Sequence, residues 1–320
     1  MKYLTKADFD VARENARPHI HRTPVMHSAT LSEMTGAEVH LKAEMFQKAG
    51  SYKVRGPLNV LAHMSREARE RGLICASAGN HAQGVARAAR EYGVKATVVM
   101  AHGAPEAKIN ATRSYGAEVV LHGKVWDDAY LHSLELQKEH NLTYIHPFDD
   151  PLLVAGQGGV GYETIEDVPG LDMLIVPIGG GGLIAGCAQI VKLINPKVKV
   201  VGVEMALAPA MKRSIEAGRI ITLDKIPIII DGLAVKTVGE YNFEICKAFV
   251  DDIVTVAEKE IFAAIPWIME RCKLVAEGAA AASVAALLTE AVKPPAGSTV
   301  ACVLSGGNLN LSALQNMTWN

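Results

Sequence analysis

Several features that would place this chain in a particular class of protein are missing from its sequence. Aromatic residues make up only 5% of the 320 residues, and no run of five or six like charges occurs. The 32 basic and 34 acidic residues give a formal net charge of -2. Proteins that coat nucleic acid normally carry a basic excess, so we expect no nucleic-acid partner. With 49% hydrophobic residues, the chain is also too apolar for a disordered protein.

No uninterrupted apolar run is long enough to cross a membrane. The longest, from Met173 to Val191, is broken by Pro177 and by four consecutive glycines. The first residues contain no hydrophobic stretch typical of a secretory signal, and the five cysteines include no C-x-x-C pair. An odd number of scattered cysteines is typical of a reducing compartment. We therefore expect a cytoplasmic protein with no membrane partner.

The short motifs of several common enzyme classes are also missing. There is no H-E-x-x-H zinc motif, no G-x-S-x-G nucleophile motif and no nucleotide P-loop. The eleven histidines show no metal-ligand spacing, so no metal site is predicted. One G-x-G-x-x-G match, Gly156 to Gly161, follows the turn Phe148–Pro151. A dinucleotide site needs a strand at that point, so we interpret these glycines as close helix packing.

Short apolar runs alternate with longer amphipathic stretches along the chain. This alternation predicts βαβ units with parallel sheets, and hence an α/β fold. Helices are expected between most strands, for example over His81–Tyr92, Trp126–Glu139 and Leu183–Ile194. Strands are predicted at Val39–Ala43, Leu73–Ala76, Ala96–Met100, Glu118–Leu121, Thr143–His146, Met173–Ile178, Val198–Val203, Ile253–Val256 and Thr299–Leu304. The runs 173–178 and 299–304 contain no alternating polar residues, which predicts central strands buried on both faces.

Two turn-rich points divide the chain. One lies near Ala49 and Gly50, and the other is the cluster His146-Pro-Phe-Asp-Asp-Pro151. We predict a large domain formed by residues 1–50 and 147–320, with a small α/β domain inserted at 51–146.

Four consecutive glycines, Gly179 to Gly182, form the most informative local motif. They directly follow the apolar run 173–178 and precede Leu183. This order predicts a strand, a loop without side chains and a helix start. The backbone N–H groups of such a loop, together with the helix dipole, can bind one anion. The Lys-Ser/Thr ending of a nucleotide P-loop is missing, so a single phosphate group fits better.

Three further segments carry polar side chains next to predicted strands or glycines. Lys53 lies between Gly50 and Gly56, and a lysine with a lowered pKa can form an imine with a carbonyl cofactor. Taken alone, it would more often be a solvated surface lysine, like Lys42. In the segment from Ser77 to His81, Asn80 alone would be a helix cap, and His81 a capped or surface histidine. Ser305 follows the last predicted strand, where ligands bind in open α/β sheets.

Four of these segments occur together in an order that resembles a known family. They are Ser-Tyr-Lys53-Val-Arg-Gly, Ser-Ala-Gly-Asn80-His-Ala-Gln-Gly, Gly179–Gly182 and Ser305-Gly-Gly-Asn. The family is that of the tryptophan-synthase-β-like (fold type II) pyridoxal-phosphate enzymes, and the resemblance covers nearly the whole chain. Within it, the sequence is most similar to the threonine/serine dehydratase and serine racemase branch, and to the catabolic-type threonine dehydratases in particular. The resemblance implies a two-domain α/β fold with twisted parallel-type sheets, and pyridoxal 5'-phosphate bound to the large domain.

The resemblance also implies roles for the matching positions. Lys53 would be the catalytic residue, bound covalently to the cofactor. Asn80 would bond the cofactor's 3'-oxygen, and Ser305 would face the pyridine nitrogen. The full set of cofactor-binding residues would be Tyr52, Lys53, Asn80, Gly179, Gly180, Gly181, Gly182, Leu183, Gly232, Glu277 and Ser305. The substrate carboxylate would be held by Ser77, Ala78, Gly79, Asn80 and His81.

The implied reaction is β-elimination of L-threonine and L-serine to 2-oxobutanoate or pyruvate plus ammonia. Alternatives within the family are a dehydratase for threo-3-hydroxyaspartate or phenylserine, and a serine racemase. The resemblance to the racemases of this branch implies a serine at the position of Ala78, where it would transfer a proton on the opposite face of the substrate. Alanine cannot transfer a proton, which disfavours racemisation. Alternatives from other classes are a non-catalytic binding module and, if Gly156–Gly161 were a dinucleotide site, an oxidoreductase.

Two further expectations follow from the resemblance. The family's cation site keeps Glu204 and Ala208 here but has Ala210 in place of an aspartate. A tightly bound divalent metal is therefore not expected, because hard cations need several oxygen ligands. The resemblance also implies a homodimer or homotetramer.

Overall fold

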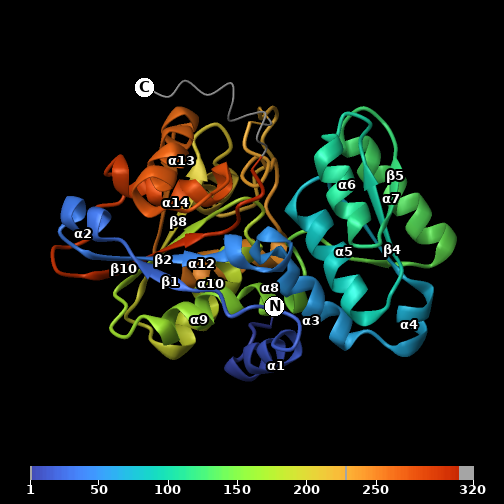
Figure 1. The fold of residues 1–320 in the computed structure, drawn as a ribbon, viewed down its shortest axis with the longest axis horizontal. Helices are drawn as coiled ribbons and strands as arrows, with labels where there is room; N and C mark the ends of the chain where they lie inside the picture. Colours follow the sequence, from blue (N-terminus) through green and yellow to red (C-terminus); the bar gives the residue numbers. More distant parts are fainter. Residues whose placement is uncertain (1, 228, 310–320) are drawn as a thin grey trace.

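The computed structural model describes residues 2–227 and 229–309, whose strands form two sheets, a large sheet of six strands and a small sheet of four. Figure 1 shows the large sheet on the left and the small sheet on the right. The strands are β1 (Val25–His27), β2 (Glu38–Ala43), β3 (Leu73–Ala76), β4 (Ala96–Met100), β5 (Glu118–Leu121), β6 (Thr143–Tyr144), β7 (Met173–Pro177), β8 (Lys199–Met205), β9 (Asp252–Val256) and β10 (Thr299–Leu304).

The large sheet has the strand order β1-β2-β10-β7-β8-β9, and every pair except β1-β2 is parallel. Nearly all side chains of the central strands β10, β7 and β8 are buried. This confirms the prediction that the runs 173–178 and 299–304 are central strands. Helices α13 (Glu258–Cys272) and α14 (Gly278–Leu288) lie on one side of the sheet, and α9 (Gly159–Asp167) and α10 (Gly182–Ile194) lie on the other (Figure 1).

The small sheet has the order β5-β4-β3-β6, and all its pairs are parallel. Strands β3, β4 and β5 begin and end where the sequence predicts. Strand β6 ends two residues earlier than predicted, at Tyr144. The reason is local: the His146 Nδ1 accepts the backbone N–H groups of Phe148 and Asp149, which turns the chain away from the sheet.

The three predicted helices are present to within one residue at each end. Two of the three are α5 (Asn80–Tyr92) and α7 (Trp126–His140), and the third is α10. The other helices are α1 (Lys6–Ala16), α2 (Ala29–Thr35), α3 (Arg55–His63), α4 (Arg66–Arg71), α6 (Glu106–Ser114), α8 (Pro151–Gln157), α11 (Ala210–Ala217) and α12 (Glu240–Phe249), with the 3-10 turns η1 (Glu44–Phe46), η2 (Lys48–Gly50) and η3 (Tyr52–Val54). Asp150 shows how a helix start is fixed, because its carboxylate accepts the N–H groups of Leu152 and Leu153.

The glycines from 156 to 161 lie at the junction of α8 and α9 and not after a strand. A Cβ at Gly156 would lie 2.5 Å from the carbonyl oxygen of Arg55, and one at Gly161 would lie 2.8 Å from the Cα of Cys187. This confirms the interpretation as close helix packing and excludes a dinucleotide site of the strand–loop–helix type. The sequence does not predict β1, because three residues are too few to show an alternating pattern.

The strands of the small sheet all come from residues 73–144, and those of the large sheet come from the chain before and after them. The predicted α/β class with parallel sheets is therefore confirmed. The domain boundaries at residues 50 and 147 stay a prediction. Within the described residues, no helix has both the length and the apolar character that a membrane crossing requires.

Candidate active site

The carboxyl ends of three parallel strands lead into the predicted site segments. Strand β3 leads into residues 77–80, β7 into the glycine loop Gly179–Gly182, and β10 into Ser305. Strand β3 belongs to the small sheet, and β7 and β10 belong to the large one. Ligand sites of open α/β sheets form outside the carboxyl ends of their strands. Hydrogen bonds link the segments that follow β3 and β10, as described below.

Lys53 lies in the short turn η3, directly before α3. The backbone N–H of Tyr52 donates to the Ser305 carbonyl at 3.1 Å, which ties this turn to the end of β10. The Lys53 Nζ donates to the Pro147 carbonyl at 2.8 Å, and no carboxylate of the described residues lies within 4 Å of it. Burial lowers the pKa of Lys53 to about 8, so far more of it is the free amine near neutral pH than for an ordinary lysine.

A buried cluster of four charged side chains anchors the chain next to Lys53. Its members are at most 5% exposed and are Lys42, Glu44, Arg55 and Glu163. Arg55, the first residue of α3, forms paired hydrogen bonds of 2.8 Å with Glu44 and with Glu163. Lys42 donates to Glu163 at 2.7 Å and to the Thr23 carbonyl at 2.8 Å. Two positive and two negative charges balance each other, so no charge in the cluster is left buried and unpaired.

The glycine loop joins β7 to α10 as predicted, and close neighbours leave no space for side chains on it. A Cβ at Gly179 would lie 2.2 Å from the Gly232 carbonyl oxygen, and one at Gly180 would lie 2.3 Å from the Phe148 ring. Gly181 has a φ of 95° and is the N-cap of α10. Bare backbone N–H groups at a helix start are the usual environment of a phosphate group. The loop therefore fits the phosphate of the cofactor that the resemblance implies.

Asn80 is the first residue of α5, and the N-cap is Gly79, so the interpretation of Asn80 as a helix cap is wrong. The Asn80 Nδ2 donates to Glu277 at 2.5 Å, and its Oδ1 accepts from the Asn308 Nδ2 at 2.8 Å. The same Asn308 Nδ2 donates to the Ala49 carbonyl at 2.8 Å. A carbonyl can only accept, so Ala49 fixes which end of the Asn308 amide faces Asn80. That contact in turn directs the Asn80 Nδ2 toward Glu277.

Glu277 lies at the N-cap of α14, and its backbone N–H donates to the Gly306 carbonyl at 3.1 Å. Burial raises the pKa of this carboxyl group to about 7, and the hydrogen bond from Asn80 and the positive charge of Lys108 limit the rise. Glu277 can therefore hold a proton near neutral pH, directly beside the amide of Asn80.

His81 is buried, with 3% of its surface exposed, and its Nε2 lies 3.0 Å from the Ile145 carbonyl. Burial lowers the pKa of His81 to about 3, so the ring is neutral. The interpretation of His81 as a capped or surface histidine is therefore wrong. Its side chain points into the protein, so only its backbone N–H at the start of α5 is left to meet a carboxylate.

Ring distance, burial and one local hydrogen bond describe further predicted site residues. The Tyr52 ring centre is 5.3 Å from the Lys53 Nζ. Leu183, in the first turn of α10, and Ser305 are both buried. The N–H of Gly79 donates to the Ser77 hydroxyl at 3.2 Å, which shapes the loop that contains Ala78.

Four residues without a predicted binding role, Asn308, Phe148, Gln157 and Asn242, contact predicted site residues. Asn308 ends the Ser-Gly-Gly-Asn motif, and that position was the available signal. The Asn242 Nδ2 donates to the carbonyls of Phe148 and Gly180, both at 2.9 Å. Nothing in the local sequence of Asn242 indicates this contact, because it joins parts of the chain 62 and 94 residues apart.

At the position of the family's cation site, the carboxylate of Glu204 binds protein backbone. Its two oxygens accept the N–H groups of Met211 at 2.7 Å and Lys212 at 2.9 Å, at the start of α11. Burial raises the pKa of Glu204 to about 7. The described residues contain no group of three or more histidine, cysteine or acidic side chains placed to hold a metal ion.

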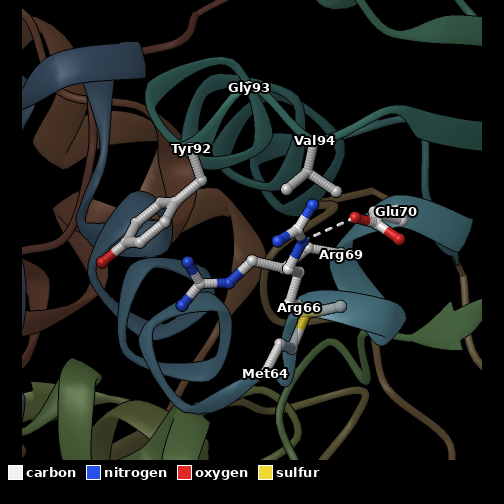
Figure 2. Close-up of a pocket in the computed structure, with 7 residues that line it drawn as sticks. All are labelled: Met64, Arg66, Arg69, Glu70, Tyr92, Gly93 and Val94. Atoms are coloured by element: carbon white, nitrogen blue, oxygen red, sulfur yellow. Dashed lines mark hydrogen bonds and ion pairs between the residues drawn. The ribbon is translucent and has the colours of Figure 1, made fainter.

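A surface hollow of about 450 Å³ lies at the far end of α5 from Asn80 (Figure 2). Its walls include two arginines, of which Arg66 pairs with Glu70 at 2.8 Å and Arg69 lies 5.0 Å from the centre of the Tyr92 ring. It is lined by Met64, Arg66, Arg69, Glu70, Tyr92, Gly93 and Val94. None of these is a predicted site residue, so the hollow is separate from the site around Lys53.

Comparisons with known proteins agree with the geometry. A family model described as pyridoxal-phosphate dependent enzyme matches residues 16–306. The chain is 45% identical to an L-threonine ammonia-lyase of Thermotoga maritima over 98% of this chain and 78% of that protein. It is 41% identical to a catabolic L-threonine dehydratase of Staphylococcus aureus over 98% of this chain and 92% of that protein. The structure of maize serine racemase is also similar, with a TM-score of 0.94 and 33% identity, over 98% of this chain and 96% of that one.

Proposed function

The chain belongs to the pyridoxal-phosphate dependent enzymes, and we propose that it deaminates L-threonine and L-serine by β-elimination. The products are 2-oxobutanoate or pyruvate, together with ammonia. The observation that carries the proposal is the Lys53 amine, which has a lowered pKa and lies where the turn before α3 meets Pro147. The relatives named as L-threonine ammonia-lyase and L-threonine dehydratase support threonine as the substrate.

Pyridoxal 5'-phosphate, when bound, supplies an electron sink for the negative charge that develops at the substrate's α-carbon. In this proposal Lys53 bonds to it covalently, and the N–H groups of Gly179–Gly182 and Leu183 bind its phosphate. Asn80 bonds its 3'-oxygen and Ser305 faces its ring nitrogen. Tyr52, Gly232 and Glu277 line the remaining walls.

The chain's own groups then bind the amino acid and move its proton. The backbone N–H groups of residues 77–81, at the start of α5, hold the substrate carboxylate. The substrate's amino group would take the place of Lys53 at the cofactor, and the freed Lys53 amine would then accept the α-proton, for which a pKa of about 8 is well suited. After the β-hydroxyl group has left, the released product hydrolyses to the 2-oxo acid and ammonia.

Two alternatives within the family remain to be tested against this proposal. The likeness to maize serine racemase favours racemisation. Ala78 opposes it, because a racemase needs a second proton-carrying group and alanine has none. A dehydratase for threo-3-hydroxyaspartate or phenylserine would use the same residues on a different side chain.

A cytoplasmic location and a homodimer or homotetramer are part of the proposal. The location is supported by the cysteines, all five of which are free thiols, as expected in a reducing compartment. The assembly is supported by the resemblance alone.

The test measures 2-oxo acid release from L-threonine, L-serine, D-serine, L-threo-3-hydroxyaspartate and phenylserine, with formation of D-serine from L-serine measured in parallel. We expect turnover of L-threonine and L-serine that is lost in Lys53→Ala. Release from the other hydroxy amino acids alone, or D-serine formation without 2-oxo acid release, would contradict the proposal.

A further inference from the structure

We propose that the side-chain amide of Gln157 hydrogen-bonds an oxygen of the cofactor's phosphate group, as part of the cradle formed by Gly179–Gly182. The proposal rests on the cofactor of the family and not on the identity of the amino acid that is deaminated. It gives a binding role to a side chain from the G-x-G-x-x-G segment, which otherwise serves close packing.

Gln157 is the last residue of α8, and its side chain is completely buried. Neither its Oε1 nor its Nε2 has a hydrogen-bond partner among the residues that the structure describes. Leaving a buried polar group without a partner costs about 1–3 kcal/mol. Native proteins therefore pair such groups, and a pairing at this site requires a polar group that is not part of the described chain.

The amide of Gln157 lies beside the first residue of α10. A Cβ at Gly182 would lie 2.6 Å from the Gln157 Oε1, which is possible only because this residue is a glycine. The stem of Gln157 packs against Gly56, where a Cβ would lie 3.3 Å from its Cγ. Contacts with α3 and α10 thus hold the side chain in place, with its polar end at the cradle.

Two backbone carbonyls near the amide, those of Phe148 and Gly180, already accept a hydrogen bond. The Phe148 carbonyl oxygen, which would lie 2.7 Å from the same Gly182 Cβ, accepts from the Asn242 Nδ2, as does the Gly180 carbonyl. Since neither end of the Gln157 amide has a partner, the amide can turn over so that its N–H₂ group, in place of the Oε1 that lies beside Gly182, donates to an oxygen that enters the cradle. A phosphate at this position gains one more neutral donor in addition to the backbone N–H groups.

The alternative partner is a buried water that stays whether or not the cofactor is bound. The two partners predict different effects of removing the amide. If the amide binds phosphate, its removal weakens binding of the phosphorylated cofactor only. If it binds a permanent water, its removal destabilises the protein without cofactor and leaves the preference for the phosphate group unchanged.

The test compares pyridoxal 5'-phosphate with pyridoxal, which lacks the phosphate group. Dissociation constants of both are measured for the cofactor-free full-length protein by absorbance, for the wild type and Gln157→Leu. We expect the dissociation constant for pyridoxal 5'-phosphate to rise about tenfold. We expect pyridoxal binding to change less than twofold, and the urea midpoint of the cofactor-free variant to be equal to or above that of the wild type.

Gln189→Leu is the matched control. Gln189 is also completely buried and also has an Oε1 without a partner among the described residues, but it lies in α10, about two turns beyond Gly182. Its Nε2 donates to the Leu4 carbonyl at 3.2 Å. We expect this variant to unfold at lower urea, with an unchanged ratio of the two dissociation constants.

Gln157→Met repeats the test with a side chain of similar length, in case leucine impairs folding. The proposal is overturned if the binding of pyridoxal and pyridoxal 5'-phosphate weakens equally, or if neither changes while the cofactor-free protein loses stability. No turnover is measured, so a protein that fails to deaminate threonine still tests the role of Gln157.

Discussion

Two lysines with little or no exposure, eleven positions apart, have different surroundings. Lys42 is completely buried and bonds to Glu163 and to a backbone carbonyl within a charge-balanced cluster. Lys53 is partly buried and bonds only to the Pro147 carbonyl, with no carboxylate of the described residues in contact. The comparison teaches that burial alone does not make a lysine reactive. A buried lysine becomes a usable base where no contacting anion stabilises its charged form.

The largest expected difference between the two lysines is in catalysis. Lys53→Ala is expected to lower threonine deamination on the order of 10³-fold or more, because it removes both the covalent attachment and the proton acceptor. Lys42→Met is expected to keep turnover per folded molecule within a few fold of the wild type. Both are measured as 2-oxo acid formed per active site at 15 °C, where the less stable variant remains folded. Equal losses of turnover in the two variants would contradict the assignment of the catalytic role to Lys53 alone.

The next largest effect concerns the charge balance around Lys42. Glu163→Gln removes the carboxylate that bonds to Lys42, leaving only Asp167 at 4.0 Å, and leaves Arg55 with one carboxylate, so we expect a loss of about 3–5 kcal/mol in the free energy of unfolding. Glu166→Gln is the control, since Glu166 is in the same helix and pairs with Arg13 and Arg22 at the surface. That variant is expected to lose less than ~1 kcal/mol. Urea unfolding of the two proteins measures both values.

The third prediction concerns the free energy of unfolding, which replacement of Lys53 is expected to raise and replacement of Glu163 to lower. Its pKa falls from 10.5 in the unfolded chain to about 8 in the folded protein, so folding favours the neutral amine. The shift lowers the free energy of unfolding by its full amount below pH 8, and this loss disappears as the pH rises to 10.5. Lys53→Met without cofactor is therefore expected to be more stable than the wild type by up to ~3 kcal/mol at pH 7.

The difference between Lys53→Met and the wild type should shrink between pH 8 and 10.5. Thermal unfolding across this range measures it. A variant that is less stable than the wild type at pH 7 would show that the Pro147 contact outweighs the cost of desolvation.

The smallest effect belongs to a lysine that is paired but exposed. Lys236 lies 3.7 Å from Asp127, with about half of each side chain or more in solvent. Lys236→Met is expected to change the free energy of unfolding by less than ~1 kcal/mol, because water screens the pair. The same urea experiment tests this, and a loss as large as that of Glu163→Gln would contradict the role assigned to burial.

Local sequence was sufficient for most of the fold. Strands β3, β4, β5 and β10 begin and end where their apolar runs do, and the fold class follows from their alternation with helices. Strand β1 was missed because an edge strand of three residues depends on its partner β2 more than on its own composition. The end of β6 depends on the ring of His146, which no periodicity reveals.

Local sequence was less informative for the site. The glycine loop was predictable, since a run of glycines before a helix needs no distant partner to bind an anion. Lys42 and Lys53 look alike in the sequence, and what separates them is Glu163, which lies 121 residues from Lys42. Gln157 was missed for the same reason, because its position beside Gly182 results from long-range packing. Asn308 had a local signal, its place at the end of the Ser-Gly-Gly-Asn motif, but its contact with Asn80 joins positions 228 residues apart. The chemical roles implied for the site residues stay predictions.

The charge cluster around Arg55 also has a consequence for the response to ionic strength. Dissolved ions weaken interactions between charges that they can surround, and they do not enter a site that is at most 5% exposed. Concentrated salt would therefore loosen pairs at the surface, such as Lys236 with Asp127, and leave the anchor of the Lys53 turn intact. The position of the Lys53 turn is therefore expected to be insensitive to salt, because the charges that anchor it are buried.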